Sequence, residues 1–147
     1  INIGIMKSFF LLLCIALVGV GGCNSSKNMA KLSDVKWVLE TFNGEKVKLT
    51  DPNTEMYIQF EDVEKRVNGR AACNRFFGNY EIDGNKLKFS PMGATRMACP
   101  DLQKETEFFQ MLDKVESYNI KDNTLFFLAK GEVVATFKKS EETKSDK

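Results

Sequence analysis

Cysteines have the most specific chemistry of any residue type in this sequence, which contains four of them. Cys14 lies inside an apolar N-terminal run and Cys23 follows it, whereas Cys73 and Cys99 lie in the body of the chain. In an oxidising compartment, two cysteines without other partners most simply form a disulfide. Closing a loop of about 27 residues would stabilise the fold by roughly 3.5 kcal/mol in the chain-entropy model. A free thiol pair and half of a metal site are the alternatives for Cys73 and Cys99.

The sequence contains no histidine, and this absence removes several classes of catalysis. Ser-His-Asp and Cys-His mechanisms, histidine-ligated zinc and histidine proton shuttles are all excluded. Most carboxylates fall in expected turns or at polar strand ends, where solvated charge normally lies, and no glycine-rich phosphate loop occurs. The formal charge of +1 argues against a nucleic-acid partner, which requires a basic face. We therefore expect no catalytic residues, no cofactor and no metal site.

The N-terminus has the pattern of a secretory signal. Lys7 precedes an unbroken apolar run over residues 9–18, and glycines and valine then lead to Cys23. A basic start, an apolar stretch and small residues before a cleavage point are typical of a signal peptide. The segment Val20-Gly21-Gly22-Cys23 resembles a bacterial lipobox, in which the cysteine receives a diacylglyceryl group. An ordinary secretory signal with a chance cysteine is the alternative.

This pattern predicts where the chain is processed and where it resides. We expect translation to start at Met6, residues 1–22 to be a lipoprotein signal peptide, and residues 23–34 to be a tether lipid-anchored through Cys23. Several acyl chains together anchor a protein stably to a membrane. No acidic cluster follows Cys23, so the expected location is the outer membrane facing the periplasm. The processed chain has 125 residues with 20 basic and 20 acidic side chains, and its net charge is zero.

Short strands separated by turn signals make up the body of the chain, residues 35–139. Met56, Ile58 and Phe60 alternate with Tyr57 and Gln59, which indicates a strand with one buried face. We expect about eight antiparallel strands and a disordered tail over residues 140–147, which contains no apolar residue. Turn signals recur at the spacing of an all-β domain, and these are Asn43-Gly44, Asp83-Gly84, Asp122-Asn123 and Lys130-Gly131.

One segment departs from this pattern and predicts a helix over residues 100–115. Pro100 suits the first helical position, and Asp101 places negative charge at the positive end of the helix dipole. Asp101 and Glu105 are interpreted as helix capping and packing support. Phe108 and Phe109 are interpreted as core packing. They belong to one apolar stripe of residues at helical spacing, which contains Leu102, Glu105, Phe108, Phe109, Leu112 and Val115. A helix of this kind beside a meander can plug or cap an open barrel.

Two sequence blocks, together with the order of these elements, resemble the META domain of HslJ-like proteins. The first block is Gly69-x-x-x-Cys73-Asn74-x-x-x-Gly78-x-Tyr80, and the second is Thr95-x-Met97-Ala98-Cys99 directly before the expected helix. The resemblance covers residues 35–139, with Ala71-Ala72 as a departure from the more compact glycine-containing run expected before Cys73. It implies a small antiparallel β-barrel or strongly curved meander, with one α-helix inserted before the last strands. It also implies an envelope-associated protein linked to stress tolerance, but no reaction, because a fold does not define a function.

Several residues of these blocks have an expected structural role. Gly69 and Gly78 are expected to permit turns or bulges, and Asn74 to satisfy the turn after Cys73 through its own side chain. Tyr80 is expected to be half-buried with its hydroxyl at the surface. A functional interpretation adds a contact surface beside the expected disulfide, and its candidate residues are Asn74, Arg75, Thr95, Arg96 and Met97.

Three functional hypotheses follow. The first is a monomeric, non-enzymatic envelope lipoprotein that binds a protein partner, with a role in envelope stress tolerance. The second is a lipid-anchored inhibitor of a secreted protease, in which the loop over residues 92–98 presents Arg96 to a trypsin-like pocket. A loop that is rigid before docking loses little entropy on binding. The third is a carrier of an acyl chain inside the barrel, although the 12 phenylalanines more simply fill a core.

Overall fold

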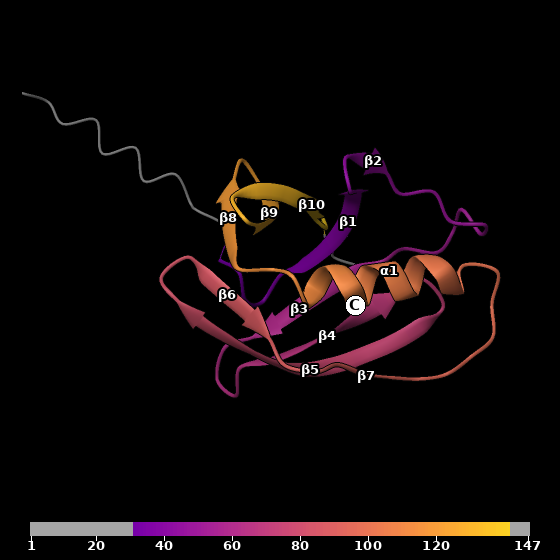
Figure 1. The fold of residues 1–147 in the computed structure, drawn as a ribbon, viewed down its shortest axis with the longest axis horizontal. Helices are drawn as coiled ribbons and strands as arrows, with labels where there is room; N and C mark the ends of the chain where they lie inside the picture. Colours follow the sequence, from indigo (N-terminus) through magenta and orange to yellow (C-terminus); the bar gives the residue numbers. More distant parts are fainter. Residues whose placement is uncertain (1–30, 142–147) are drawn as a thin grey trace, which may run out of the picture.

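The computed structural model describes residues 31–141, which form one barrel with an α-helix packed against it (Figure 1). No helix within this range has the length and apolarity needed to cross a membrane. The elements, in chain order, are β1 (Lys36–Phe42), β2 (Glu45–Lys46), β3 (Tyr57–Glu61), β4 (Arg66–Ala71), β5 (Asn74–Asp83), β6 (Lys86–Phe89), β7 (Gly93–Ala94), α1 (Leu102–Leu112), β8 (Ser117–Lys121), β9 (Thr124–Ala129) and β10 (Glu132–Lys139).

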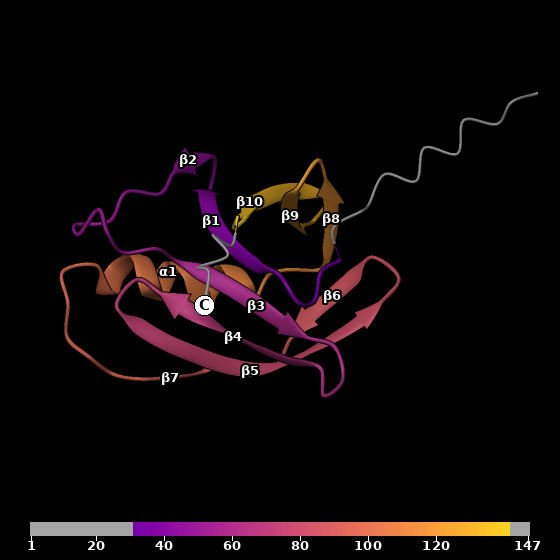
Figure 2. The same cartoon turned by 180° about the vertical axis from the view of Figure 1, so that it is seen from behind.

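Eight of the strands close into an antiparallel barrel, which confirms the fold predicted from the sequence. The hydrogen-bonded order runs β10-β9-β8-β6-β5-β4-β3-β1, and β1 pairs again with β10, so the sheet has joined ends. Figures 1 and 2 show β1, β8, β9 and β10 forming one part of the barrel and β3 to β6 the other, with α1 lying along β4 and β5. The two-residue strands β2 and β7 extend the sheet from β1 and β5.

Three of the predicted turn signals form two-residue hairpin turns in which both residues have positive φ. The φ values are 49° and 83° at Asn43-Gly44, 49° and 61° at Asp122-Asn123, and 52° and 80° at Lys130-Gly131. Such turns have the twist of the strands that they connect. The turn signal at Asn43-Gly44 predicts a second strand over residues 45–49, but β2 ends at Lys46, while β1 pairs along its length with β3 and β10.

The helix is shorter than the predicted range of residues 100–115. It begins at Leu102 and ends at Leu112. Leu102 is 41% exposed, so its predicted place in the apolar stripe that faces the core is wrong. Val115 is buried at 4% exposure, although it lies beyond the helix. Asp101 occupies the N-cap position but makes no side-chain capping bond there, because its carboxylate binds Thr50 instead. Asp101 therefore lies at the predicted capping position, with its negative charge at the start of the helix, but it does not cap the helix through its side chain.

Aromatic side chains fill the interior of the barrel. Trp37, Phe127 and Phe137 are fully buried, and the rings of the last two lie 4.8 Å apart. Phe108 of α1 is also fully buried, and its ring centroid lies 5.7 Å from that of Phe76. Phe109 is half-buried and packs against the core beside it, so the predicted core role of Phe108 and Phe109 is confirmed. A core filled in this way favours packing over the carriage of an acyl chain.

Tyr80 corrects one expectation. Its side chain is only 3% exposed, and its hydroxyl donates a hydrogen bond to the Glu61 carbonyl at 3.3 Å. The inward side of β5 begins with Asn74 and Phe76 and continues to Tyr80, because alternate residues of a strand share one face. Tyr80 is therefore a core residue and not a half-buried one, and its hydroxyl bond to Glu61 lies in a partly exposed position.

Several predicted features lie outside the described residues. They are the start at Met6, the signal peptide over residues 1–22, the lipidated Cys23 with the tether up to residue 30, and the tail from residue 142. Leu32 lies within the range predicted as tether, and it packs on the core at 9% exposure. Its carbonyl accepts a hydrogen bond from the indole of Trp37 at 2.9 Å.

Candidate functional site

The disulfide between Cys73 and Cys99 joins the turn after β4 to the segment before α1. The two Cα atoms lie 6.3 Å apart. The turn contains Ala72, which is buried and has a φ of 54°, a left-handed conformation that glycine adopts more readily. This is where the sequence departs from the expected glycine-containing run. The disulfide fixes the C-terminal end of the segment over residues 95–99.

Asn74 fixes the other end of this segment. Its side chain is fully buried, and its Oδ1 accepts hydrogen bonds from the Thr95 hydroxyl at 2.9 Å and the Met97 N–H at 2.7 Å. Its Nδ2 donates to the Met97 carbonyl at 3.1 Å and to the Glu105 carboxylate at 3.0 Å. The expectation that Asn74 serves its own turn is therefore wrong, because its side chain joins β5 to the segment after β7. Asn74 is buried beneath the predicted contact surface. It holds Thr95 and Met97 in place but is not itself exposed to a partner.

Glu105 completes this buried network. Its carboxylate is 8% exposed and accepts a second hydrogen bond, at 3.2 Å, from the backbone N–H of Asn74. A buried carboxylate is costly unless it is hydrogen-bonded, and Glu105 also lies in the first turn of α1, where the helix dipole favours negative charge. The interpretation of Glu105 as a capping and packing residue missed its bond to Asn74. A glutamate on the core-facing stripe of a helix was the available signal for a buried partner.

Four of the five predicted contact residues lie together at the surface. Arg75, Thr95 and Arg96 are exposed, and Met97 is 58% exposed. The Thr95 N–H donates to the Arg75 carbonyl at 3.0 Å, and the Arg75 N–H donates to the Thr95 hydroxyl at 3.1 Å. These bonds place Thr95, the residue after β7, directly beside Arg75 of β5. Arg75, Thr95, Arg96 and Met97 are called the loop surface below.

Asp101 attaches the start of α1 to the loop between β2 and β3. Its carboxylate accepts bonds from the Thr50 N–H at 2.9 Å, the Thr50 hydroxyl at 3.2 Å and the Lys104 ammonium at 2.6 Å. The bond from Lys104, followed by that from the Thr50 N–H, lowers the pKa of Asp101 below its ordinary value of 3.8. The sequence did not single out Thr50, because nothing in its local pattern shows that its loop meets the helix.

The two block glycines lie within strands, so the prediction that they permit turns or bulges is wrong. A Cβ on Gly69 of β4 would overlap the Tyr57 carbonyl oxygen of β3 and lie 2.7 Å from the Phe76 ring. A Cβ on Gly78 of β5 would press on the Met92 side chain. Both glycines therefore serve close packing: Gly69 lets β4 lie close to β3 and the Phe76 ring, and Gly78 makes room for Met92, just before β7.

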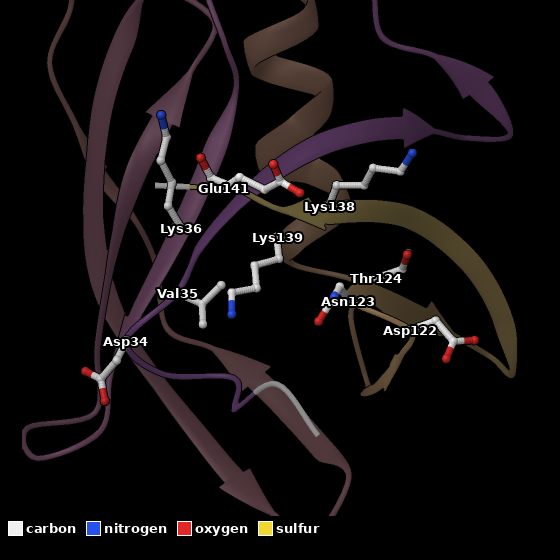
Figure 3. Close-up of a pocket in the computed structure, with 10 residues that line it drawn as sticks. Asp34, Val35, Lys36, Asp122, Asn123, Thr124, Lys138, Lys139 and Glu141 are labelled. Atoms are coloured by element: carbon white, nitrogen blue, oxygen red, sulfur yellow. The ribbon is translucent and has the colours of Figure 1, made fainter. Parts of the chain in front are cut away.

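A separate hollow of about 600 Å³ lies at the ends of β1 and β10 and the turn between β8 and β9 (Figure 3). It contains none of the loop surface, and two of its cations are already paired, Lys36 with Glu55 at 2.7 Å and Lys138 with Glu40 at 2.9 Å. Ser33 and Lys36 have the Ser-x-x-Lys spacing of some acyl-transfer enzymes, which the sequence interpretation overlooked. The pairing of Lys36 with Glu55 does not favour the role of a general base.

Comparisons with known proteins give a family and a fold. A family model described as META domain matches residues 30–141. A protein from Burkholderia xenovorans, whose structure was solved by NMR, is similar at 25% identity and a TM-score of 0.62, over 74% of this chain and 83% of that chain. A second NMR structure is similar at 25% identity and a TM-score of 0.58, over 73% and 90% of the two chains. A crystal structure of a DUF4847 family protein from Bacteroides vulgatus shares the fold at 13% identity and a TM-score of 0.52, over 73% and 93%. None of the curated proteins compared with this chain matches it.

Proposed function

This chain belongs to the META domain family, and on that basis we propose that it is a non-enzymatic lipoprotein of the cell envelope that acts by binding a protein partner. The lipid on Cys23 would hold the barrel at the outer membrane, facing the periplasm. A contribution to envelope stress tolerance would follow from the partner that the barrel engages. Support for the binding role comes from the loop surface, and support for the anchor comes from the sequence before residue 24.

The observation that carries this proposal is an exposed segment fixed at both ends. Thr95 and Met97 are hydrogen-bonded to the buried Asn74, and Cys99 is covalently joined to Cys73. Between these fixed points Arg96 and Met97 remain exposed. Ordering a flexible side chain or loop on binding costs about 0.5–1.5 kcal/mol per immobilised side chain, and a segment that is already ordered avoids much of this cost. Arginine is also among the residues that most often dominate a binding interface.

A pull-down from envelope extract tests the proposal. Wild-type protein and an Arg75→Ala/Arg96→Ala variant are used as bait, and a Lys88→Ala/Lys121→Ala variant is the control, since these exposed lysines lie on β6 and β8. We expect one specific partner to be captured by the wild type and by the lysine variant, and to be lost with the arginine variant. Identical captures from all three proteins would refute a role for the loop surface in binding.

Inhibition of a trypsin-like protease is a second candidate, and one feature of the network favours it. The Asn74 Oδ1 holds the residues on both sides of Arg96, through the Thr95 hydroxyl and the Met97 N–H. A rigid loop with a single exposed basic side chain between two fixed neighbours suits the pocket of a trypsin-like enzyme, which binds a basic residue.

Protease assays separate this candidate from general binding. We expect an inhibitor to block a trypsin-like enzyme, and Arg96→Ala to abolish the block while leaving the melting temperature almost unchanged. Arg75→Ala serves as the matched control, because it removes a neighbouring exposed arginine. The absence of inhibition by the wild type would eliminate this candidate and leave the binding proposal in place.

A further inference from the structure

Strand β7 leaves one of its edges without a strand partner among residues 31–141. It pairs with β5 through Ala94 opposite Phe76 and Gly93 opposite Phe77, and the Thr95 N–H donates to the Arg75 carbonyl at 3.0 Å. In an antiparallel pair, successive residues direct their N–H and C=O groups alternately toward the partner strand and away from it. Since Thr95 bonds toward β5, the N–H and C=O of Ala94 point away from β5.

A groove lies between this free edge and helix α1. It is an open surface groove of about 620 Å³, and its walls include Ala94 and Arg96 on one side and Phe109 on the other. The helix contributes Glu105 and Phe109, and its C-cap residue Asp113 continues the same spacing of four, so the three residues share one face. Figures 1 and 2 show β7 at the outer side of β5, with α1 covering the same part of the sheet.

The charges along the groove differ from one end to the other. Arg96 lies near the start of α1, because its neighbour Thr95 and Glu105 both bind Asn74. Asp113 lies about 12 Å further along the helix, since each residue adds roughly 1.5 Å, and there the C-terminal end of the helix dipole adds negative potential. Glu105 at the Arg96 end already accepts two hydrogen bonds from Asn74. The half-buried ring of Phe109 lies between the two ends and offers an apolar contact.

We propose that this groove binds an extended segment of a protein partner, which adds to the sheet as a strand along β7. This inference rests on the proposed binding function and names the class of segment that is bound. The segment runs antiparallel to β7, as all the strand pairs of the barrel do, and its backbone pairs with the N–H and C=O of Ala94. Read from its N-terminus, it carries an acidic side chain toward Arg96, an apolar side chain over Phe109 and a basic side chain toward Asp113. The tail of this chain over residues 140–147 does not fit, because it has no apolar residue.

Selection from a phage-displayed library of random linear peptides on the full chain tests this inference. We expect the selected peptides to share the order acidic, apolar, basic, and to slow the hydrogen exchange of the Ala94 amide. Ala94→Pro removes the outward N–H and keeps the donors that face β5, so it should weaken peptide binding about tenfold. Asp113→Lys should select peptides that carry an acidic residue in place of the basic one, at the C-terminal end of the bound segment. Circular dichroism checks that each variant is folded.

Three results would overturn the inference. The first is that no peptide is enriched, or that enriched peptides leave the exchange of the Ala94 amide unchanged. The second is that the peptides bind a folded Ala94→Pro variant as tightly as the wild type. The third is a concentration-dependent protection of Ala94 without peptide, which would assign the groove to a second copy of the chain. In each of these cases, a partner captured from envelope extract through Arg75 and Arg96 would still support the proposed binding function. Failure of the strand-addition inference can therefore be distinguished from failure of the proposed function.

Discussion

Asn74 is the residue on which the loop surface depends. Its side chain has no exposed area, yet it holds the exposed Thr95 and Met97, through bonds of 2.7–3.1 Å, and it also donates a bond to the buried Glu105 at 3.0 Å. A buried polar network that is fully satisfied rigidifies its surroundings, whereas a partly satisfied network is costly. The sequence placed Asn74 among the contact residues, but it acts as their internal support.

Replacement of Asn74 therefore has a large expected effect on stability. Asn74→Ala leaves the buried Glu105 carboxylate without its side-chain donor, and we expect the free energy of unfolding to fall by about 3 kcal/mol. Thr95→Val, which removes only one hydroxyl, should cost about 1 kcal/mol. Urea unfolding of Asn74→Ala, Glu105→Ala and the double variant measures the coupling, which we expect to be about 1–3 kcal/mol. Additive losses would show that the two side chains do not act together.

Asp101 predicts a change of stability with pH. The bond from Lys104 and the Thr50 N–H lower its pKa in the folded state below 3.8, so folding favours the ionised carboxylate. This contribution is complete above the pKa of the unfolded chain, and it is lost as the pH falls from about 4 through the folded-state pKa. Asp101→Asn should therefore flatten the decline of unfolding free energy below about pH 4. Asp51, whose pKa is also lowered, by bonds from Asn53 and Thr54, contributes in the same range, and Asp51→Asn is the comparison. An unchanged acid profile in Asp101→Asn would contradict the assignment.

At the scale of elements, the sequence predicts the individual strands and turns well, but it does not predict which elements contact one another. Alternating residues such as Met56, Ile58 and Phe60 predict β3 and its buried side, and positive φ at Asn43-Gly44 agrees with the turn signal. The close approach of β3, β4 and β5 around Gly69 is a property of neighbouring strands, which no local pattern contains. The same is true of Thr50, which meets α1 from a loop about fifty positions away in the chain.

Gly69 and Gly78 provide a matched test of this close packing. A Cβ at Gly69 meets the backbone of β3, which cannot move independently, whereas a Cβ at Gly78 meets the flexible Met92 side chain. We expect Gly69→Ala to lower the free energy of unfolding by about 3 kcal/mol, at the upper end for overpacking, and Gly78→Ala by about 1 kcal/mol. Thermal unfolding of the two variants measures the difference. Equal losses of unfolding free energy in the two variants would show that the contact with the β3 backbone does not make Gly69 less tolerant of a Cβ than Gly78.

The disulfide contributes at the same scale, because it joins a turn to the segment before the helix. Its cysteines are separated by 26 positions, and the chain-entropy model assigns such a bridge about 3.5 kcal/mol. Cys73→Ser/Cys99→Ser should lower the free energy of unfolding in urea by roughly this amount. A loss close to zero would show that the Asn74 network alone holds the segment.

At the scale of the whole molecule, the barrel closes by pairing its first and last long strands, β1 and β10. The number and antiparallel order of the strands could be predicted from turn spacing, and the family resemblance predicted a barrel or curved meander with a helix before the last strands. The candidate surface was predicted in part, since Arg75, Thr95, Arg96 and Met97 lie together. The buried bonds from Asn74 to Glu105 and the groove beside β7 could not be predicted, because they depend on how the helix lies on the closed sheet.

The central claim of this account is that the loop surface is ordered before any partner binds. Backbone ¹⁵N relaxation of Arg96 and Met97 in the free, oxidised full chain measures this order most directly. We expect order parameters near 0.85, about those of rigid backbone, and a clear fall in Asn74→Ala. Order parameters below about 0.6 at Arg96 and Met97 in the wild type would show a flexible loop and contradict the claim.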